Sequence, residues 1–166
     1  TNIVFGRAMF RGVQGGIKTN IRLAGKADIA SVGELGRSNF VYSRFHLDPQ
    51  ISVETANELK SSWALNYFKG KRGDYLFVAE KDNVIVGFSQ VILGDDSVCI
   101  DLIAVDNDFT RQGIASDLIK KTESICGDKE RVVVGTQISN APSISLYEKL
   151  GFSICSSKYV LHYHNL

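Results

Sequence analysis

The sequence IDLIAVDNDFTRQGIASDLI, residues Ile100–Ile119, changes from an apolar run to a polar loop and then to a helical pattern. The apolar run ends a strand predicted over Ser97–Val105, and near-continuous apolar character is typical of a buried central strand. A polar loop follows over Asp106–Arg111, and the apolar spacing after it predicts a helix over Gly113–Cys126. A strand, a loop and a helix in this order predict a crossover unit that leads to a further, parallel strand.

Elements on both sides of this unit indicate the fold class. A hairpin turn at Lys81–Asn83 predicts antiparallel pairing upstream of the crossover. Antiparallel hairpins followed by two crossover units predict an α/β fold, more exactly a mixed α+β sheet. The other predicted strands are Asn2–Phe10, Thr19–Leu23, Tyr75–Glu80, Val84–Leu93, Arg131–Thr136 and Phe152–His162, and the other predicted helices are Ile29–Phe40, Val53–Phe68 and Ala141–Leu150.

Polar residues and glycines mark the ends of these helices. Asp28 and Ser52 precede two of them and are suited to N-cap their free N–H groups. Gly151 follows the last predicted helix, in the position of a C-cap glycine.

The length of 166 residues suits one domain. We predict a single domain over residues 19–166, preceded by an N-terminal extension or partial strand over residues 1–18. Within that extension Gly12, Gly15 and Gly16 indicate a turn or linker. Thr1–Arg11 lacks the long apolar stretch of a secretion signal.

The composition excludes several classes of partner. The chain has 19 Lys and Arg against 18 Asp and Glu, a net charge of +1, which argues against nucleic-acid binding. The densest basic segment, Lys69–Arg72, is expected to be a solvated loop. No apolar run approaches the roughly 18–20 residues that span a bilayer, so no membrane association is predicted.

The three cysteines, Cys99, Cys126 and Cys155, show no spacing typical of a metal site, and no metal is predicted. We interpret them as reduced, mostly buried thiols of a cytoplasmic protein. A catalytic cysteine paired with one of the histidines remains an alternative that nothing in the spacing favours.

The helix that opens at Gly113 has the features of an anion site. The first N–H groups of a helix have no internal partners and carry the positive end of its dipole. Small residues at Gly113 and Ala115 would let a diphosphate approach the backbone closely, and Ser116 adds a hydroxyl. The same pattern also occurs where a helix packs tightly on a sheet. The segment matches neither a P-loop nor a dinucleotide fingerprint.

A second group of residues follows on the next helix. Asn140 is placed either to cap that helix or to turn its amide toward a ligand. Tyr147 lies on the apolar stripe with Ile144, where a tyrosine is usually part of the core. The functional alternative makes its hydroxyl a proton donor to a leaving group.

Together, VDNDFTRQGIA at residues 105–115 and NAPSISLYEKLGF at residues 140–152 resemble the two signature segments of the GNAT superfamily of N-acetyltransferases. The order of elements is similar too, and the resemblance covers roughly residues 19–163. It implies a GNAT-type fold, with a mostly antiparallel sheet, a splayed parallel pair at the cofactor cleft and about four flanking helices. It also implies acetyl-CoA as co-substrate.

Within the superfamily, SRFH at residues 43–46 and TQISN at residues 136–140 resemble most the bacterial TDP-fucosamine acetyltransferase group. Those enzymes acetylate the 4-amino group of a nucleotide-linked dideoxy sugar. They carry extra structure before the acetyltransferase core, so this chain is either a shorter relative or an excised domain.

The resemblance implies roles for particular residues. Tyr147 would protonate the departing CoA thiolate, and Asn140 would contact the cofactor arm. The superfamily usually has Gln or Arg where this chain has Thr110, and Arg111 would supply that charge instead. The remaining cofactor contacts would come from the strand end Ile103, Ala104 and Val105 and from the helix start Gln112, Gly113, Ile114, Ala115 and Ser116.

The acceptor side is less defined by the motifs. We predict that Arg44, Phe45 and His46, in the loop before Pro49, border the acceptor amine. Asp101 is predicted to share a strand face with Ile103 and Val105, and so to point toward the cleft, unless it is an ordinary polar position. The candidate bases for the amine are Glu80, Asp101, His46 and a water chain.

Three functions remain open at this point. The first is transfer of an acetyl group to a small-molecule amine, such as a nucleotide-linked amino sugar, by direct attack in a ternary complex. The second is acetylation of a protein N-terminus or lysine. The third is a non-catalytic acyl-CoA-binding module, because fold does not imply function. A monomer or a homodimer is expected.

Overall fold

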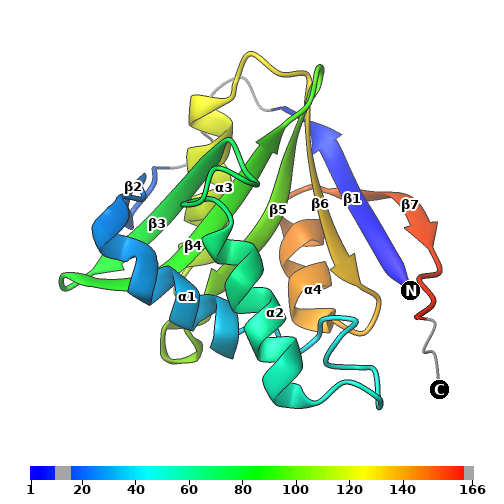
Figure 1. Cartoon of the computed structure of the whole chain (residues 1–166). Coiled ribbons are helices and arrows are strands. Elements are labelled where there is room, and N and C mark those ends of the chain that lie inside the picture. Colours follow the sequence, from blue (N-terminus) through cyan, green and yellow to red (C-terminus); the bar gives the residue numbers. More distant parts are fainter. Residues whose placement is uncertain (10–15, 163–166) are drawn as a thin grey trace.

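The computed structural model describes residues 1–9 and 16–162, which form a twisted sheet with helices on both faces (Figure 1). The predicted turn at Gly12 and Gly15 lies outside the described residues. The strands are β1 (Asn2–Ala8), β2 (Asn20–Leu23), β3 (Tyr75–Lys81), β4 (Val84–Leu93), β5 (Ser97–Val105), β6 (Arg131–Gln137) and β7 (Ser153–Lys158). The helices are α1 (Ile29–Ser38), α2 (Val53–Leu65), α3 (Ile114–Ile125) and α4 (Ala141–Lys149), with short 3-10 turns at Lys26–Asp28 and Asn107–Phe109.

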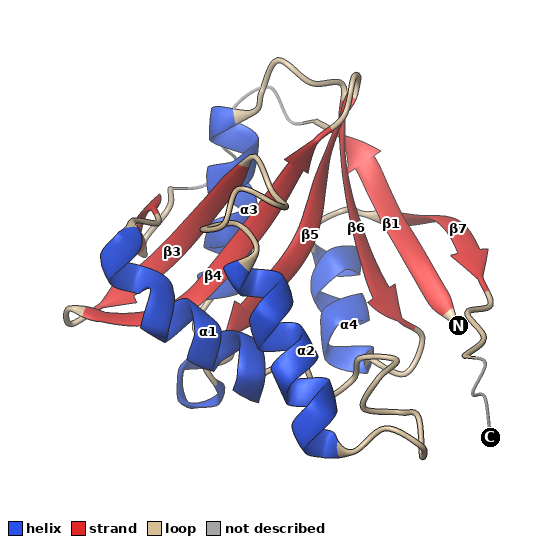
Figure 2. Cartoon of the chain, in the orientation of Figure 1, coloured by secondary structure: helices blue, strands red, loops and turns tan. Residues whose placement is uncertain are grey.

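The sheet order is β2-β3-β4-β5-β6-β1-β7. Figure 2 shows the strands from β3 to β7 in this order. Among the described strands β5 and β6 pair in parallel, and all other neighbours pair antiparallel. This confirms the predicted mixed sheet with a parallel pair. The chain reaches β6 through α3, as a crossover between parallel strands requires.

The helices divide the core into two parts. In Figure 1, α1 and α2 cover the near face of the sheet, and α3 and α4 lie behind it. On the near face Val32 of α1 and Ala64 of α2 pack with Phe88 and Leu102 of the sheet. The far face forms the larger cluster, in which α3 and α4 pack against side chains of β1, β5 and β6. Each helix therefore has a defined sheet face, which decides what its polar residues can reach.

One strand and one helix are shorter than predicted. The last strand was predicted to continue to His162, but β7 stops at Lys158. Lys158 pairs with Asn2, the first residue of β1, so beyond it no β1 backbone remains to bond. The helix predicted to Phe68 ends at Leu65, and the chain then turns through Gly70, whose φ is +65°.

The first strand is an integral part of the sheet. β1 lies between β6 and β7 and pairs with both. Its Phe5 is fully buried, and the Phe5 ring lies 5.6 Å from that of Tyr147. The domain boundary at residue 18 stays a prediction, although the strand before it contributes to the same core.

Three local predictions match the structure. Asp82 and Asn83, between β3 and β4, have φ of +51° and +63°, as a type I′ hairpin turn requires. The Ser52 hydroxyl caps α2 by accepting from the Thr55 N–H at 3.1 Å. Gly151 follows α4 with φ of +79°, the left-handed conformation of a C-cap glycine.

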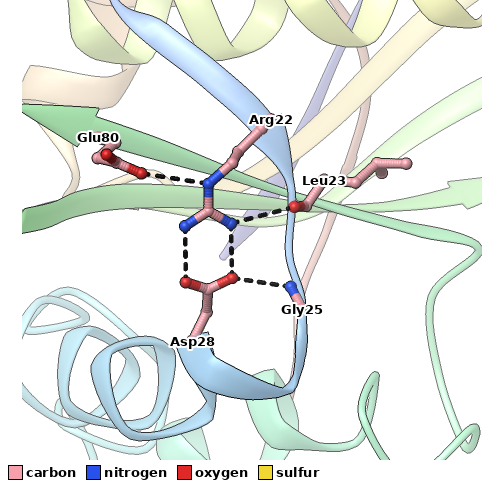
Figure 3. A network of polar contacts seen from close by, with 5 residues as sticks. All are labelled: Arg22, Leu23, Gly25, Asp28 and Glu80. Atoms are coloured by element: carbon pink, nitrogen blue, oxygen red, sulfur yellow. Dashed lines mark hydrogen bonds and ion pairs between the residues drawn. The ribbon is translucent and has the colours of Figure 1, made fainter. Parts of the chain in front are cut away.

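Asp28 lies at the N-cap position of α1 as predicted, but its carboxylate does not cap the helix and is used elsewhere (Figure 3). It accepts two hydrogen bonds from the Arg22 guanidinium, at 2.7 and 2.9 Å, and one from the Gly25 N–H at 2.7 Å. Arg22 also bonds Glu80 of β3. The network therefore ties the start of α1 to β2 and β3, at the edge of the sheet.

Replacing Asp28 tests how much this network stabilises the fold. Asp28 is 4% exposed, and charged hydrogen bonds of this kind contribute about 1–3 kcal/mol. We expect Asp28→Asn to lower the free energy of unfolding by that amount at pH 7, measured by urea denaturation. Glu80→Gln is the control, because Glu80 makes a single, more exposed bond to the same arginine and should change stability by less than about 1 kcal/mol.

The pH dependence gives a second readout of the same network. Hydrogen bonding to Arg22 holds the pKa of Asp28 below its ordinary value of 3.8. The unfolded state therefore binds the proton more tightly, and the stabilisation is present above pH 3.8 and lost as the pH falls through the lower folded-state pKa. Asp28→Asn should reduce this loss of stability at low pH. If the loss is unchanged in the variant, other carboxylates cause it.

Candidate active site

A cleft opens where β5 and β6 separate. The two strands pair only over Ser97–Ile100 and Arg131–Val134. Beyond these residues β5 continues to Val105 and β6 to Gln137 without pairing with each other. The cleft has a volume of about 1240 Å³, and its walls include the far ends of β5 and β6, the start of α3 and one side of α4. The sheet thus has its opening at the predicted splayed pair.

A bulge at Asp101 changes the direction of the β5 side chains. Gln90 of β4 pairs with Leu102 and the next residue pairs with Ile100, so Asp101 has no partner in the β4–β5 register. Ile100 consequently packs on the α3 and α4 face, whereas Leu102 packs on the α1 and α2 face.

The prediction that Asp101 shares a face with Ile103 and Val105 is therefore wrong. Ile103 and Val105 pack on the α3 and α4 face, whereas the Asp101 carboxylate is held by Arg72 and Gln90. Both Asp101–Arg72 bonds measure 2.6 Å. Asp101 still lines the cleft, but as the acid of an ion pair.

The start of α3 is open toward this cleft. Gly113 precedes the helix with φ of +84°, and no side chain caps the first N–H groups. A Cβ built on Gly113 meets nothing within 4 Å, so the space beside the helix end is free. The predicted residues Arg111, Gly113, Ile114, Ala115 and Ser116 all line the cleft. An uncapped helix start beside open space is the kind of arrangement that binds anions in proteins.

Gln112 differs from the other residues predicted to hold the pyrophosphate. It does not line the cleft, and its side-chain oxygen accepts a hydrogen bond from the Lys81 ammonium at 2.6 Å. Its side chain joins the loop before α3 to the end of β3. The structure therefore brings together five of the six predicted residues from Arg111 to Ser116 and leaves Gln112 outside the cleft lining.

Asn140 lies at the start of α4 and at the cleft wall. Its side-chain oxygen accepts from the Ser143 N–H at 3.3 Å, and its amide donates to the Thr136 hydroxyl at 3.1 Å. The capping interpretation is therefore correct, and the residue also borders the cleft. Both sides of the amide are engaged, so Asn140 connects the end of β6 rigidly to α4.

Tyr147 lies on α4, lines the cleft and is 2% exposed. Its ring packs between Phe5 of β1 and Phe152, with centroids 5.6 and 5.9 Å away. Burial raises the pKa of the Tyr147 hydroxyl to about 12, against a smaller opposing effect of a hydrogen bond with Ser143. Tyr147 is therefore a neutral phenol that keeps its proton over the physiological pH range.

Two of the three residues predicted to border the acceptor lie in the cleft. Arg44 and Phe45 line it, from the segment between α1 and α2. The Arg44 guanidinium lies 4.8 Å above the Phe45 ring, and that ring meets Trp63 of α2 edge-on at 5.4 Å. The pair forms an aromatic and cationic part of the cleft wall.

The structure does not bring His46 into the cleft lining. One ring nitrogen bonds the Ser43 hydroxyl at 2.6 Å and the other bonds the Asn57 side-chain oxygen at 2.8 Å. Both nitrogens are thus engaged, the first within the loop and the second in fastening the loop to α2. Glu80 is similarly engaged with Arg22 and lies outside the cleft lining. Of the candidate protein bases, only Asp101 lines the cleft.

Three further residues of the cleft were not predicted from the sequence, namely Lys60 and Trp63 of α2 and Arg72. All three line it, and Lys60 is 9% exposed. A signal for Lys60 was present, because it lies four residues from both Ala56 and Ala64, which are fully buried. A lysine in the middle of an apolar helical stripe indicates either an internal ion pair or a site.

Three further expectations concern residues away from the cleft. Cys126 is buried and Cys99 is half-buried, but Cys155 is exposed because it lies on the edge strand β7. Within residues 1–9 and 16–162 no cluster of His, Cys, Asp or Glu is arranged to hold a metal ion. No helix of these same ranges has the length and apolar character that crossing a membrane requires.

The splayed sheet and the open helix start define an acyl-CoA-type transferase fold, and the family follows from the sequence. The chain belongs to the acetyltransferase (GNAT) family, whose model matches residues 41–152. This confirms the resemblance seen in the two signature segments. The family uses acetyl-CoA.

Curated relatives show two kinds of similarity. The spore coat polysaccharide biosynthesis protein SpsD of Bacillus subtilis (strain 168) is 35% identical over 140 residues, which cover 81% of this chain and 47% of SpsD. N-alpha-acetyltransferase 30 of Homo sapiens is 42% identical over 55 residues, which cover 32% of this chain and 15% of that protein. The chain thus spans about half of SpsD and a smaller part of the second relative.

A solved structure supports the fold. The PaiA N-acetyltransferase of Thermoplasma acidophilum, in complex with coenzyme A, superposes with a TM-score of 0.70 at 16% identity. The superposition covers 85% of this chain and 93% of that one. The mixed sheet with its parallel pair is therefore the fold of known GNAT acetyltransferases.

Proposed function

We propose that this chain transfers the acetyl group of acetyl-CoA to the primary amine of a small molecule, by direct attack in a ternary complex. The observation that carries the proposal is Tyr147, a buried, neutral phenol that lines the same cleft as the uncapped start of α3. One feature supplies a proton and the other supplies an anion site, and both belong to the opening between β5 and β6.

The donor half of the cleft is built for a diphosphate and an extended arm. The N–H groups at the start of α3, from Gly113 to Ser116, would hold the pyrophosphate. Arg111 would add its positive charge, and Asn140 would border the arm at the start of α4. Bound there, acetyl-CoA supplies the acetyl group as an activated thioester.

The end of β5 would stabilise the charge that develops on the acetyl oxygen. Beyond Ile100 the β6 side of β5 has no strand partner, and Ile103, Ala104 and Val105 line the cleft there. We assign the backbone N–H of Ile103 to the developing oxyanion. Loss of one such donor typically lowers the rate by about 10²–10³-fold.

Tyr147 would complete the transfer as general acid. The amine nitrogen forms a bond to the acetyl carbon, the carbon–sulfur bond breaks, and the Tyr147 hydroxyl gives its proton to the sulfur. The nitrogen loses one proton in the same sequence. Because His46 and Glu80 are engaged outside the cleft, the acceptor of that proton is Asp101 or water.

The nature of the wall at Arg44 supports a small-molecule acceptor. Arg44, Lys60 and Arg72 line this part of the cleft against a single carboxylate, Asp101. An excess of positive charge disfavours a lysine-rich peptide. SpsD is named for polysaccharide biosynthesis, which agrees with an amino sugar, and a nucleotide-linked amino sugar is the acceptor that we favour.

A thioester-release assay tests this proposal. Acetyl-CoA would be offered with nucleotide-linked amino sugars, polyamines and peptides, and free CoA thiol would be measured. We expect release above background with amino sugars and not with peptides. Release with peptides alone would instead favour a protein acetyltransferase, and tight CoA binding without release for any amine would favour a binding module.

A further inference from the structure

Lys60 is a buried cation that has no ion-pair partner in the described part of the chain. It projects from α2 into a cage of two rings, with its ammonium 4.6 Å from the centre of Trp63 and 4.9 Å from that of Phe40. Burial, together with a smaller effect of the positive charge of Arg44, lowers the pKa of Lys60 to about 8. Aromatic faces attract a cation, but they do not neutralise its charge.

Arg44 lies beside Lys60 and, like it, has no ion-pair partner in the described part of the chain. Its guanidinium lies over Phe45, at 4.8 Å, and over Trp63, at 6.0 Å, and it forms no ion pair within residues 1–9 and 16–162. The third cation of this wall, Arg72, is neutralised by Asp101. The wall therefore holds two uncompensated positive charges, on Arg44 and Lys60, and both side chains line the cleft.

We propose that Arg44 and Lys60 form an anion-binding subsite for a phosphate or diphosphate group carried by the acceptor. The inference rests on the proposed acetyl transfer and defines the class of its substrate, an amine that also bears phosphate. Two adjacent cations match a dianion, and the planar guanidinium is suited to bidentate contact with phosphate oxygens.

This subsite is separate from the one at the start of α3. Lys60 belongs to α2, which packs on one face of the sheet, whereas α3 packs on the other. The cofactor pyrophosphate at Gly113 therefore leaves the charges of Arg44 and Lys60 uncompensated. The charges of Arg44 and Lys60 therefore call for a second anion, which the acceptor would carry.

The two cations have an alternative role, which is to pack against Trp63 and stabilise α2. In that case their positive charge would have no ligand. The two roles differ in one measurable respect, because only a subsite binds an added anion while the first anion site is filled.

The test is isothermal titration of inorganic pyrophosphate into protein saturated with CoA. We expect a single additional site in the wild type, weakened about tenfold or more in both Arg44→Gln and Lys60→Met. Lys69→Met is the matched control, because Lys69 is exposed just beyond α2 and outside the cleft lining, and it should leave the affinity unchanged. The CoA affinity of each variant, measured in the same series, reports that the fold is intact.

Malonate tests the preference for phosphate, because it offers two carboxylates instead. We expect malonate to bind at least severalfold more weakly than pyrophosphate, and equal affinities would overturn the assignment to phosphate. Equal loss of pyrophosphate affinity in Lys69→Met, or none in the two cleft variants, would overturn the subsite.

The pH dependence adds an independent readout. Lys60 faces Arg44 from the loop before α2, Arg72 from the loop after it and Asp101 from β5. Asp101 is paired with Arg72, and the pKa of Lys60 is about 8, so the charge of Lys60 changes near that pH. Pyrophosphate affinity should fall as the pH rises above the Lys60 pKa, and Lys60→Met should remove that fall.

Failure of the subsite can be distinguished from failure of the proposed acetyl transfer. Pyrophosphate binding that depends on Arg44 and Lys60, without any thioester release, would keep the subsite and reject the acetyl transfer. Thioester release with amines that carry no phosphate, without this pyrophosphate binding, would keep the acetyl transfer and reject the subsite. If CoA itself does not bind, the same variants can be compared in the free protein.

Discussion

Tyr147→Phe is expected to lower kcat for acetyl transfer by about 10²-fold or more, the usual contribution of a positioned general acid. The hydroxyl is the only group removed, and the ring contacts with Phe5 and Phe152 remain. Because the pKa of Tyr147 is raised to about 12, the phenol keeps its proton across the assay range, and its donation should be independent of pH from about 6 to 10. The Kd for acetyl-CoA should stay nearly unchanged.

Tyr75→Phe is the matched control for this result. Tyr75 of β3 is also part of the core, stacked on Phe77 at 5.9 Å, but it does not line the cleft. It should keep wild-type kcat. The general-acid assignment would be wrong if Tyr147→Phe also kept wild-type kcat, and a parallel loss in both variants would indicate a packing effect.

Gly113→Val is expected to raise the Kd for acetyl-CoA by about tenfold or more, equivalent to about 1.4 kcal/mol. The reason is geometric, because a branched side chain at the uncapped start of α3 would occupy the space through which an anion reaches the N–H groups. The substitution also places a side chain at φ of +84°, which costs about 1–2 kcal/mol of stability.

Gly70→Val separates these two effects. Gly70 also has a left-handed φ, +65°, and a Cβ built on it likewise meets nothing within 4 Å, but it lies outside the cleft lining. Both variants should lose similar stability in thermal unfolding, and only Gly113→Val should lose affinity for acetyl-CoA. Equal affinities in the two variants would mean that the start of α3 is not the pyrophosphate site.

The family and most of the fold could be read from local patterns. The strand, loop and helix around Gly113 have a spacing that sets the crossover, and a left-handed glycine ahead of a helix is a local requirement of the backbone. The position of Tyr147 on the apolar stripe of the last helix placed it in the core. Patterns of this kind depend on a few consecutive residues, so they can be recognised without knowledge of the tertiary structure.

Other features depended on contacts between distant segments. The place of β1 between β6 and β7 and the hydrogen bonds of Asp28 and His46 all involve partners that sequence spacing does not identify. The bulge at Asp101 is one such feature, because a single extra residue against β4 reverses which side chains face which layer. Alternation within β5 alone therefore predicted the wrong face for this carboxylate.

The sequence by itself determined the family, the order of the elements and most of the residues that line the cleft at the start of α3, because these follow from short-range motifs. Only the tertiary structure decided which charges meet on the α2 side of the cleft, where Arg44 and Lys60 lie over Trp63 and Arg72 pairs with Asp101. Charges from α2 and from two loops become neighbours only when α2 packs on the sheet. Whether each charge is then neutralised or left for a ligand is a property of that packing.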